Sequence, residues 1–169
     1  MQTLKNIVNA QGGPEALMRG EAVRARAGRR ALVVEYAGAS PRRRHAVRAY
    51  QYDERLGDVI RSPEMLFETD GFAWLPYYYR NDADALTVEA FGAGRGKRAV
   101  NRKEQKRLFA LAREWERRIA EEFAGAEIDA VPGPFVNDAP PARVRPRKAR
   151  PAPRRIYEAN ARLAPEAGT

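Results

Sequence analysis

The sequence contains no cysteine, and this absence excludes several classes of protein at once. A disulfide framework, a thiolate zinc site and a cysteine nucleophile are all ruled out. The single histidine, His45, follows three arginines at the start of a predicted strand and has no evident partner that would make it a general base. The chain also lacks the roughly 20-residue apolar run of a spanning helix and the N-terminal apolar segment of a signal peptide. We therefore expect a cytoplasmic protein without a membrane partner.

Negative charge is also in short supply. The chain has 31 lysines and arginines against 22 aspartates and glutamates, which gives a formal net charge of +9. An excess of this size favours association with a polyanion such as nucleic acid. Arginine supplies 26 of the 31 cations, so a genomic bias toward arginine would produce the same excess without any selection for binding. Charge alone leaves both explanations open.

The chain divides into two parts by composition. Residues 1–125 have the mixed composition of one compact domain, which suits a total length of 169 residues. Residues 126–169 hold eight of the twelve prolines and an acid-free run of cations. We expect this Pro/Arg-rich tail to be extended or disordered, with a short helix possible at residues 156–163.

The periodicity of residues 1–125 predicts an α+β fold. A short helix at the N-terminus ends at Gly12 and Gly13. Apolar and β-branched residues then alternate with period two through several segments separated by turn residues. These segments are residues 31–36, 45–53, 64–68, 73–79 and 85–91, after a first one that begins near Val23. Pro76 makes the segment 73–79 either an edge strand or a bulged strand.

A long amphipathic helix follows the predicted strands. Asn101 has the character of an N-cap, with Glu104 placed to complete a capping box, and the helix runs to Phe123 before Gly125. The order of elements favours an antiparallel meander of four to six strands, with the short N-terminal helix and the long C-terminal helix packed on one face.

Cations concentrate in two places that could contact a phosphate backbone. One is a glycine-rich loop and the start of the long helix, where cations oppose the helix dipole. The other is the tail, where proline would hold the cations in an extended chain along phosphates. The candidate nucleic-acid-binding residues are Arg95, Lys97, Arg98, Arg102, Lys103, Lys106, Arg107, Arg143, Arg145, Arg147, Lys148, Arg150, Arg154 and Arg155.

Aromatic and acidic residues offer two further candidate sites. Tyr77, Tyr79 and Arg80 could form a stacking face for single-stranded nucleic acid, although tyrosines at strand spacing more often pack half-buried. Because side chains alternate along a strand, at least one of the tyrosines 77–79 should lie in the core. Acidic residues cluster between Asp53 and Asp84, but most fall in predicted turns, where Asp is favoured for backbone reasons. We predict no catalytic residue, no metal site and no cofactor.

Several short motifs resemble a family of small uncharacterised proteins that occur on bacterial plasmids and other mobile elements. The motifs are Gly12-Gly13-Pro14, Val33-Val34-Glu35, Gly57-Asp58, Ser62-Pro63-Glu64-Met65, Tyr79-Arg80-Asn81-Asp82 and a helix around Trp115. Ser62 departs from the acid usual at that position. The resemblance covers about residues 4–123, omits the tail, implies an accessory role in a mobile element, and brings no established activity.

Three functions are consistent with the sequence. The first is a non-enzymatic accessory protein that binds nucleic acid largely through backbone electrostatics. The second is a protein–protein adaptor or inhibitor that docks on a host or plasmid protein through residues 58–70 or 156–163, favoured if exposed apolar surface lies away from the arginines. The third is a metal-dependent hydrolase, which requires two or three of the acidic residues to converge. The sequence favours the first.

Overall fold

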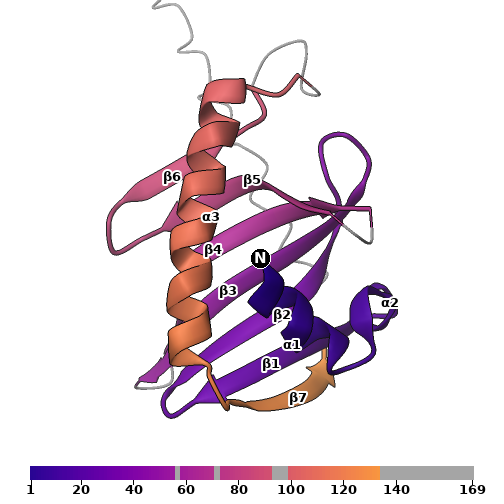
Figure 1. The fold of residues 1–169 in the computed structure, drawn as a ribbon, viewed down its shortest axis with the longest axis vertical. Coiled ribbons are helices and arrows are strands. Elements are labelled where there is room, and N and C mark those ends of the chain that lie inside the picture. The colour runs from indigo at the N-terminus through magenta and orange to yellow at the C-terminus, as the bar shows by residue number, and fades with distance from the viewer. Residues whose placement is uncertain (56–57, 71–72, 93–98, 134–169) are drawn as a thin grey trace, which may run out of the picture. The chain divides into compact units, whose positions relative to one another are not determined.

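The computed structural model describes residues 1–55, 58–70, 73–92 and 99–133. They form a seven-stranded antiparallel sheet with its helices on one face (Figure 1). The helices are α1 (Gln2–Asn9), α2 (Gly13–Met18) and α3 (Arg102–Glu122). The strands are β1 (Glu21–Ala27), β2 (Arg30–Ala39), β3 (His45–Arg55), β4 (Asp58–Thr69), β5 (Trp74–Asn81), β6 (Leu86–Glu89) and β7 (Glu127–Pro132). The predicted α+β fold is confirmed.

Strands β1 to β6 form the predicted meander, and β7 is added at its far edge. The order across the sheet is β6-β5-β4-β3-β2-β1-β7, so each of the first six strands pairs with its neighbours in the chain. Pro76 lies in β5, which pairs on both sides, beside a shift of register between Leu66 and Phe67 of β4. Of the two alternatives for this segment, the structure has the bulged strand.

The face of the sheet beneath the helices carries the main core. Alternate residues of the strands point to this face, as period-two patterning requires. Helix α3 covers it with Leu108, Ala112, Trp115 and Ile119, all buried. The strand residues in the same cluster include Val23, Ala25, Leu32, Val34, Val47, Ala49, Met65 and Phe67. This packing fixes α3 across the sheet and leaves its opposite side to solvent.

The second face of the sheet is buried too, but much of it is charged. Ala22, Val33 and Tyr50 form a small apolar cluster there. Beside it, Arg48 lies between two carboxylates, with 3.3 Å to Glu35 Oε1 and 3.1 Å to Glu64 Oε1. The side chain of Arg48 is 5% exposed. This face therefore depends on a buried ion cluster as well as on apolar burial.

Helix α3 begins where the sequence predicts. The side chain of Asn101 accepts hydrogen bonds from the backbone N–H groups of Lys103 and Glu104, which satisfies two donors of the first turn. The capping box is not completed, because the N–H of Asn101 donates instead to the carbonyl of Ala90. The helix ends at Glu122, and Gly125 follows with a φ of 74° that favours glycine.

Strand β7 corrects the predicted domain boundary. Residues 127–132 were assigned to the tail because prolines cluster after Val131. They instead pair with β1 along its whole length, from Glu127 opposite Arg26 to Pro132 opposite Glu21. An edge strand tolerates a terminal proline, since its outer N–H groups need no partner. The domain therefore continues past residue 125 and includes β7, and the sheet has one strand more than the four to six expected.

We predict that Gly133→Ala destabilises the attachment of β7. The N–H of Gly133 donates to the carbonyl of Gly20 over 2.9 Å, and a Cβ at this position would lie 2.3 Å from that same oxygen. Relieving the overlap requires the backbone to move, at an expected cost of about 1–3 kcal/mol in the free energy of unfolding. Urea titration measures this cost. Gly92→Ala is the matched control, because a Cβ there meets nothing within 4 Å; equal losses in both variants would contradict the explanation.

Candidate nucleic-acid interface

The two halves of α3 carry opposite charge. Residues 102–113 hold five cations and one carboxylate, whereas residues 114–122 hold two cations and four carboxylates. The net charge of the solvent-exposed side chains in each half determines whether that surface attracts anions or cations. The first half of α3 therefore presents a positive surface, and the second half does not.

The cations of the first half are mostly not neutralised within the described part of the chain. There, Arg102, Lys103, Lys106 and Arg113 have no carboxylate within 4.0 Å, and Arg107 has only a 3.9 Å approach to Glu104. All five side chains are exposed. Cations in the first turn of a helix also oppose its dipole. Arg102 and Lys103 therefore do not stabilise the helix.

The second half of α3 uses its charges internally. Arg117 pairs with Glu121 over 2.9 Å, and Arg118 pairs with Glu114. Two further carboxylates fasten the helix to the rest of the domain. Glu116 accepts the backbone N–H of Thr3, and Glu122 accepts from Arg30 over 2.8 Å and from Gln51 over 3.1 Å. These residues stabilise the fold and leave little free charge.

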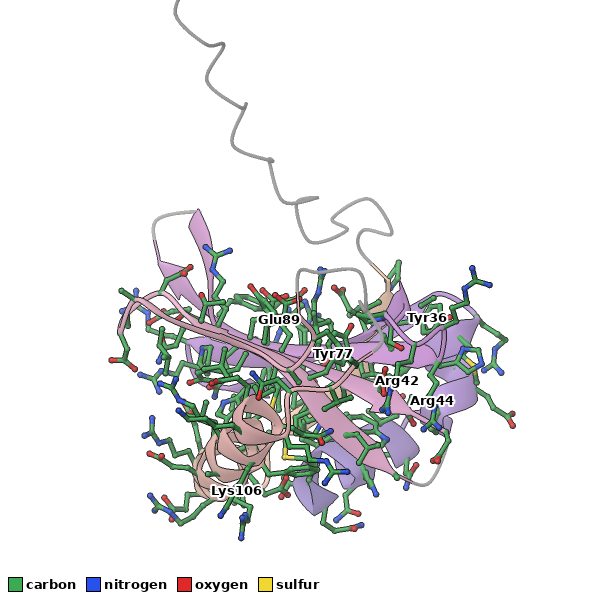
Figure 2. The ribbon with its side chains drawn as sticks, turned by 90° about the horizontal axis from the view of Figure 1, so that it is seen from above. Tyr36, Arg42, Arg44, Tyr77, Glu89 and Lys106 are labelled. Carbon is green, nitrogen blue, oxygen red and sulfur yellow. The ribbon has the colours of Figure 1, made fainter. Side chains whose placement is uncertain are left out.

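An exposed aromatic ring lies among the free cations. Phe109 is 37% exposed and lines an open groove of about 480 Å³ together with Arg102, Gln105, Lys106 and Arg113. We call Arg102, Lys106, Phe109 and Arg113 the cationic stripe. They occupy positions i, i+4, i+7 and i+11, which share one side of a helix. Figure 2 shows Lys106 on the side of α3 away from the sheet.

The sequence predicted Arg102 and Lys106 of the stripe as binding residues and missed Phe109 and Arg113. Phe109 follows the core residue Leu108 and precedes Leu111, so it was passed over among the apolar residues of the helix. The position of Phe109 around the helix axis could have identified it as an exposed residue. The buried residues of α3 are Leu108, Ala112, Trp115 and Ile119, and Phe109 lies 100° from Leu108 around a helix, off their shared side.

The remaining predicted phosphate contacts lie outside the described residues. They are Arg95, Lys97 and Arg98 of the glycine-rich loop and Arg143, Arg145, Arg147, Lys148, Arg150, Arg154 and Arg155 of the tail. The possible helix at residues 156–163 lies outside them as well. Of the predicted set, the described residues are Arg102, Lys103, Lys106 and Arg107, and these lie together in the first two turns of α3.

The predicted stacking face of tyrosines is wrong. Tyr79 is 7% exposed and packs in the core opposite Met65, so its ring is not accessible to a base. Tyr77 lies at the shift of register in β5 and packs its ring against Phe91, with 5.5 Å between centroids. Burial raises the pKa of both hydroxyls. Arg80 is exposed but pairs with Asp82 over 2.6 Å. As the alternation required, one tyrosine of the three is in the core.

A separate cleft lies between α3 and the sheet, with a volume of about 590 Å³. Many of its polar groups bond to each other. The indole N–H of Trp115 donates to Gln51 Oε1 over 2.9 Å, and the hydroxyl of Ser62 donates to Asn81 over 2.6 Å. Asn81 in turn donates to Asp84 over 2.6 Å. The Trp115–Gln51 bond holds the helix on the sheet, and the other two bonds join β4 to β5 and β5 to the turn after it. These bonds leave few of the polar groups aimed at a ligand.

The acidic residues do not assemble into a metal site within the described parts of the chain. No three of them come together there in a geometry that could hold an ion. Glu64 pairs with Arg48, and Glu68 is buried against Ser40 and Arg42. Asp82 pairs with Arg80 at an exposed turn. His45 is exposed and lies 3.1 Å from the hydroxyl of Tyr36.

None of the described helices is both long and apolar enough to cross a membrane. Comparison with curated proteins and with solved structures gave no match to this chain. One family model does match, that of the DUF6908 domain of unknown function, over residues 2–122. This match covers the helices and the first six strands that position the cationic stripe. The chain therefore belongs to the DUF6908 family.

Proposed function

We propose that the protein is a non-enzymatic, nucleic-acid-binding accessory protein of the cytoplasm. The observation that carries the proposal is the set of exposed cations on the first half of α3 that have no carboxylate partner in the described residues. Phosphates are the ligand that such a surface attracts, with an affinity that falls as salt rises. The resemblance of the sequence to proteins of plasmids and mobile elements supports an accessory role of this kind.

The division of charge along α3 supports binding over the alternative explanation, in which the excess of cations only reflects a genomic bias toward arginine. A bias toward arginine would scatter cations over the surface without regard to their partners. On this helix, Arg117 and Arg118 are each paired with a glutamate one turn away, while Arg102, Lys106 and Arg113 are not. Exposed i,i+4 pairs are the ordinary way to place charge on a helix. Their absence from the first half leaves its cations available to a ligand.

The exposed apolar residues favour nucleic acid over a protein partner. Among the described residues, the large exposed hydrophobic side chains are Met18 and Phe109. Phe109 lies between cations, whereas Met18 of α2 is a single exposed side chain and not the apolar patch that an adaptor would offer away from the cations. The segment 58–70 that was predicted to dock on a partner forms β4, in which the residues from Glu64 to Thr69 pair on both edges and bury Met65 and Phe67. This part of the segment has no free edge to offer.

We predict that Lys106→Gln with Arg113→Gln weakens binding through lost phosphate contacts. Two contacts fewer should make the slope of log K against log salt less steep by about 1.4–1.8 and lower affinity by on the order of tenfold to a hundredfold at moderate salt. The full chain is titrated into labelled DNA and RNA, single- and double-stranded, and fluorescence anisotropy is measured at several salt concentrations.

The matched control removes the same charge from the same helix. Arg117→Gln with Arg118→Gln deletes two cations that are already paired with Glu121 and Glu114. We expect this variant to keep nearly the wild-type slope, because it leaves the cationic stripe intact. If both double variants weaken binding equally, net charge rather than this surface is responsible. If the wild-type chain binds none of the four nucleic acids at low salt, the proposed function is wrong.

A further inference from the structure

We infer that the cationic stripe binds single-stranded nucleic acid, with Phe109 stacking on an unpaired base while Lys106 and Arg113 contact the phosphates on either side. The inference rests on the proposed function and adds to it the class of nucleic acid and the residue that recognises it. It replaces the stacking role that the sequence assigned to Tyr77 and Tyr79, which the structure places elsewhere.

The placement of Phe109 is the first step of the argument. The ring lies one turn after Lys106 and one turn before Arg113, and all three line the same groove. The Nε of Arg113 donates to the backbone carbonyl of Phe109 over 3.4 Å, which holds the arginine stem over this turn. With a rise of 1.5 Å per residue, the stripe from Arg102 to Arg113 is about 16 Å long. Along its length it offers two cations, a ring and a third cation.

The chemistry of the ring decides between single and double strands. A phenyl group has no donor or acceptor with which to read a base edge in a groove of a duplex. Its flat face can stack directly on an unpaired base, whereas inserting it into a duplex first requires a base step to be unstacked at a cost in free energy. Aromatic side chains beside cations are the arrangement by which proteins hold single strands without reading sequence. The amide of Gln105, in the same groove, can hydrogen-bond to any base that stacks there.

The accessibility of the ring is what separates Phe109 from the other aromatic residues described. Trp74, Tyr79, Phe91 and Trp115 are all buried in the core. Phe109 alone among the described large aromatics is exposed without a ring contact. Exposing such a ring to water gains nothing for the fold. A ring surrounded by cations without carboxylate partners suits a ligand that has both flat bases and negatively charged phosphates.

The test separates base stacking from phosphate contact. The full chain is titrated at low salt with oligothymidine and with an abasic strand of the same length, which keeps the phosphates and lacks the bases. We expect the wild-type protein to bind oligothymidine about tenfold more tightly than the abasic strand. Phe109→Ala should abolish this preference and leave binding to the abasic strand unchanged. Phe109→Leu, which keeps an apolar side chain of similar size, should abolish it as well.

Lys106→Gln with Arg113→Gln serves as the charge control and should weaken both strands while keeping the ratio between them. Equal binding of the two strands by the wild-type protein, or an unchanged preference in Phe109→Ala, would overturn the stacking role and leave the proposed function standing. Tighter binding of duplex DNA or duplex RNA than of oligothymidine would also overturn it. Absence of binding to every strand would overturn the proposed function and this inference together.

Discussion

Replacing Arg48 by methionine is expected to lower the free energy of unfolding by about 4 kcal/mol, because it removes a counter-charge from two largely buried carboxylates. Arg48 lies on the face of the sheet opposite the helices, with 5% of its side chain exposed. Glu35 is directly across from it on β2, and Glu64 approaches it from β4 on the other side. These carboxylates are 7% and 14% exposed, so water cannot replace the guanidinium.

Urea unfolding of the full chain measures this effect as a lower midpoint at an unchanged dependence on denaturant. The control is Arg26→Met, an exposed arginine on β1 of the same sheet, which should change stability by no more than about 0.5 kcal/mol. Arg48→Lys should fall between the two, since lysine keeps the charge but cannot reach two carboxylates with a planar fork. A loss in Arg48→Met no greater than in Arg26→Met would contradict the role assigned to the ion cluster.

This ion cluster also marks a limit of what the sequence could reveal. The segments around Glu35, Arg48 and Glu64 were each recognised as strands from their alternation. Their charged residues fall at positions where alternation predicts an outer, solvated face. Only the register of three strands, with Glu35 opposite Arg48 and Glu64 opposite Tyr50, shows that the charges meet one another. Register between strands depends on the pairing itself, and a single sequence does not contain it.

The helix α3 was predictable because its signals are local. Asn101 caps it, the apolar stripe around Trp115 has the period of a helix, and Gly125 follows its end. The same locality explains why part of the candidate site was predicted. Unbalanced cations between residues 102 and 107 are visible in the sequence. Among the described residues, Arg102, Lys103 and Lys106 have no carboxylate within 4.0 Å, and Arg107 approaches Glu104 at 3.9 Å. Phe109 was missed because only the packing of α3 decides which apolar residues of a helix are left outside.

Strand β7 was missed because its own sequence favours no regular structure, and because its stability comes from pairing with β1, which is distant in the sequence. The six residues 127–132 contain two acids and a proline, a composition that favours neither strand nor helix. They form a strand because β1 offers a free edge after α3 has returned the chain to that side of the sheet (Figure 1). The tyrosines 77–79 failed similarly. The shift of register at β5 breaks the alternation on which their predicted shared face depended.

A second buried carboxylate gives the other large effect, and this one depends on pH. Glu68 is 1% exposed and accepts hydrogen bonds from Ser40 over 2.7 Å and from Arg42 over 2.8 Å. Burial raises its pKa, but the bonds from Arg42 and Ser40 outweigh burial, so the pKa of Glu68 lies below its usual value. A carboxyl with a lowered pKa stabilises the fold above its unfolded pKa of about 4.3, and this contribution is lost as pH falls through the folded pKa.

Arg42→Ala should therefore lower the free energy of unfolding at neutral pH by about 3 kcal/mol. The substitution removes the counter-charge of Glu68, and the cost of burying the charged carboxylate then dominates. Without Arg42, burial raises the pKa of Glu68 above that of the unfolded chain, and the sign of the pH dependence reverses. Lowering the pH then stabilises the variant by protonating Glu68, while it destabilises the wild-type protein.

Urea unfolding across pH measures this effect. The difference in the free energy of unfolding between the wild-type protein and the variant should shrink as pH falls toward about 4. Arg44→Ala removes an exposed arginine of the same loop, whose charge lowers the pKa of Glu68 less than Arg42 does, and it should cost much less than Arg42→Ala at any pH. Adding Glu68→Gln to Arg42→Ala should recover much of the loss at neutral pH, because the buried charge is then gone. Two outcomes would contradict this explanation: a difference in stability that stays constant with pH, or a double variant no more stable than Arg42→Ala. Either would show that Arg42 acts through packing, which includes its contact with the ring of Phe91, and not through the charge of Glu68.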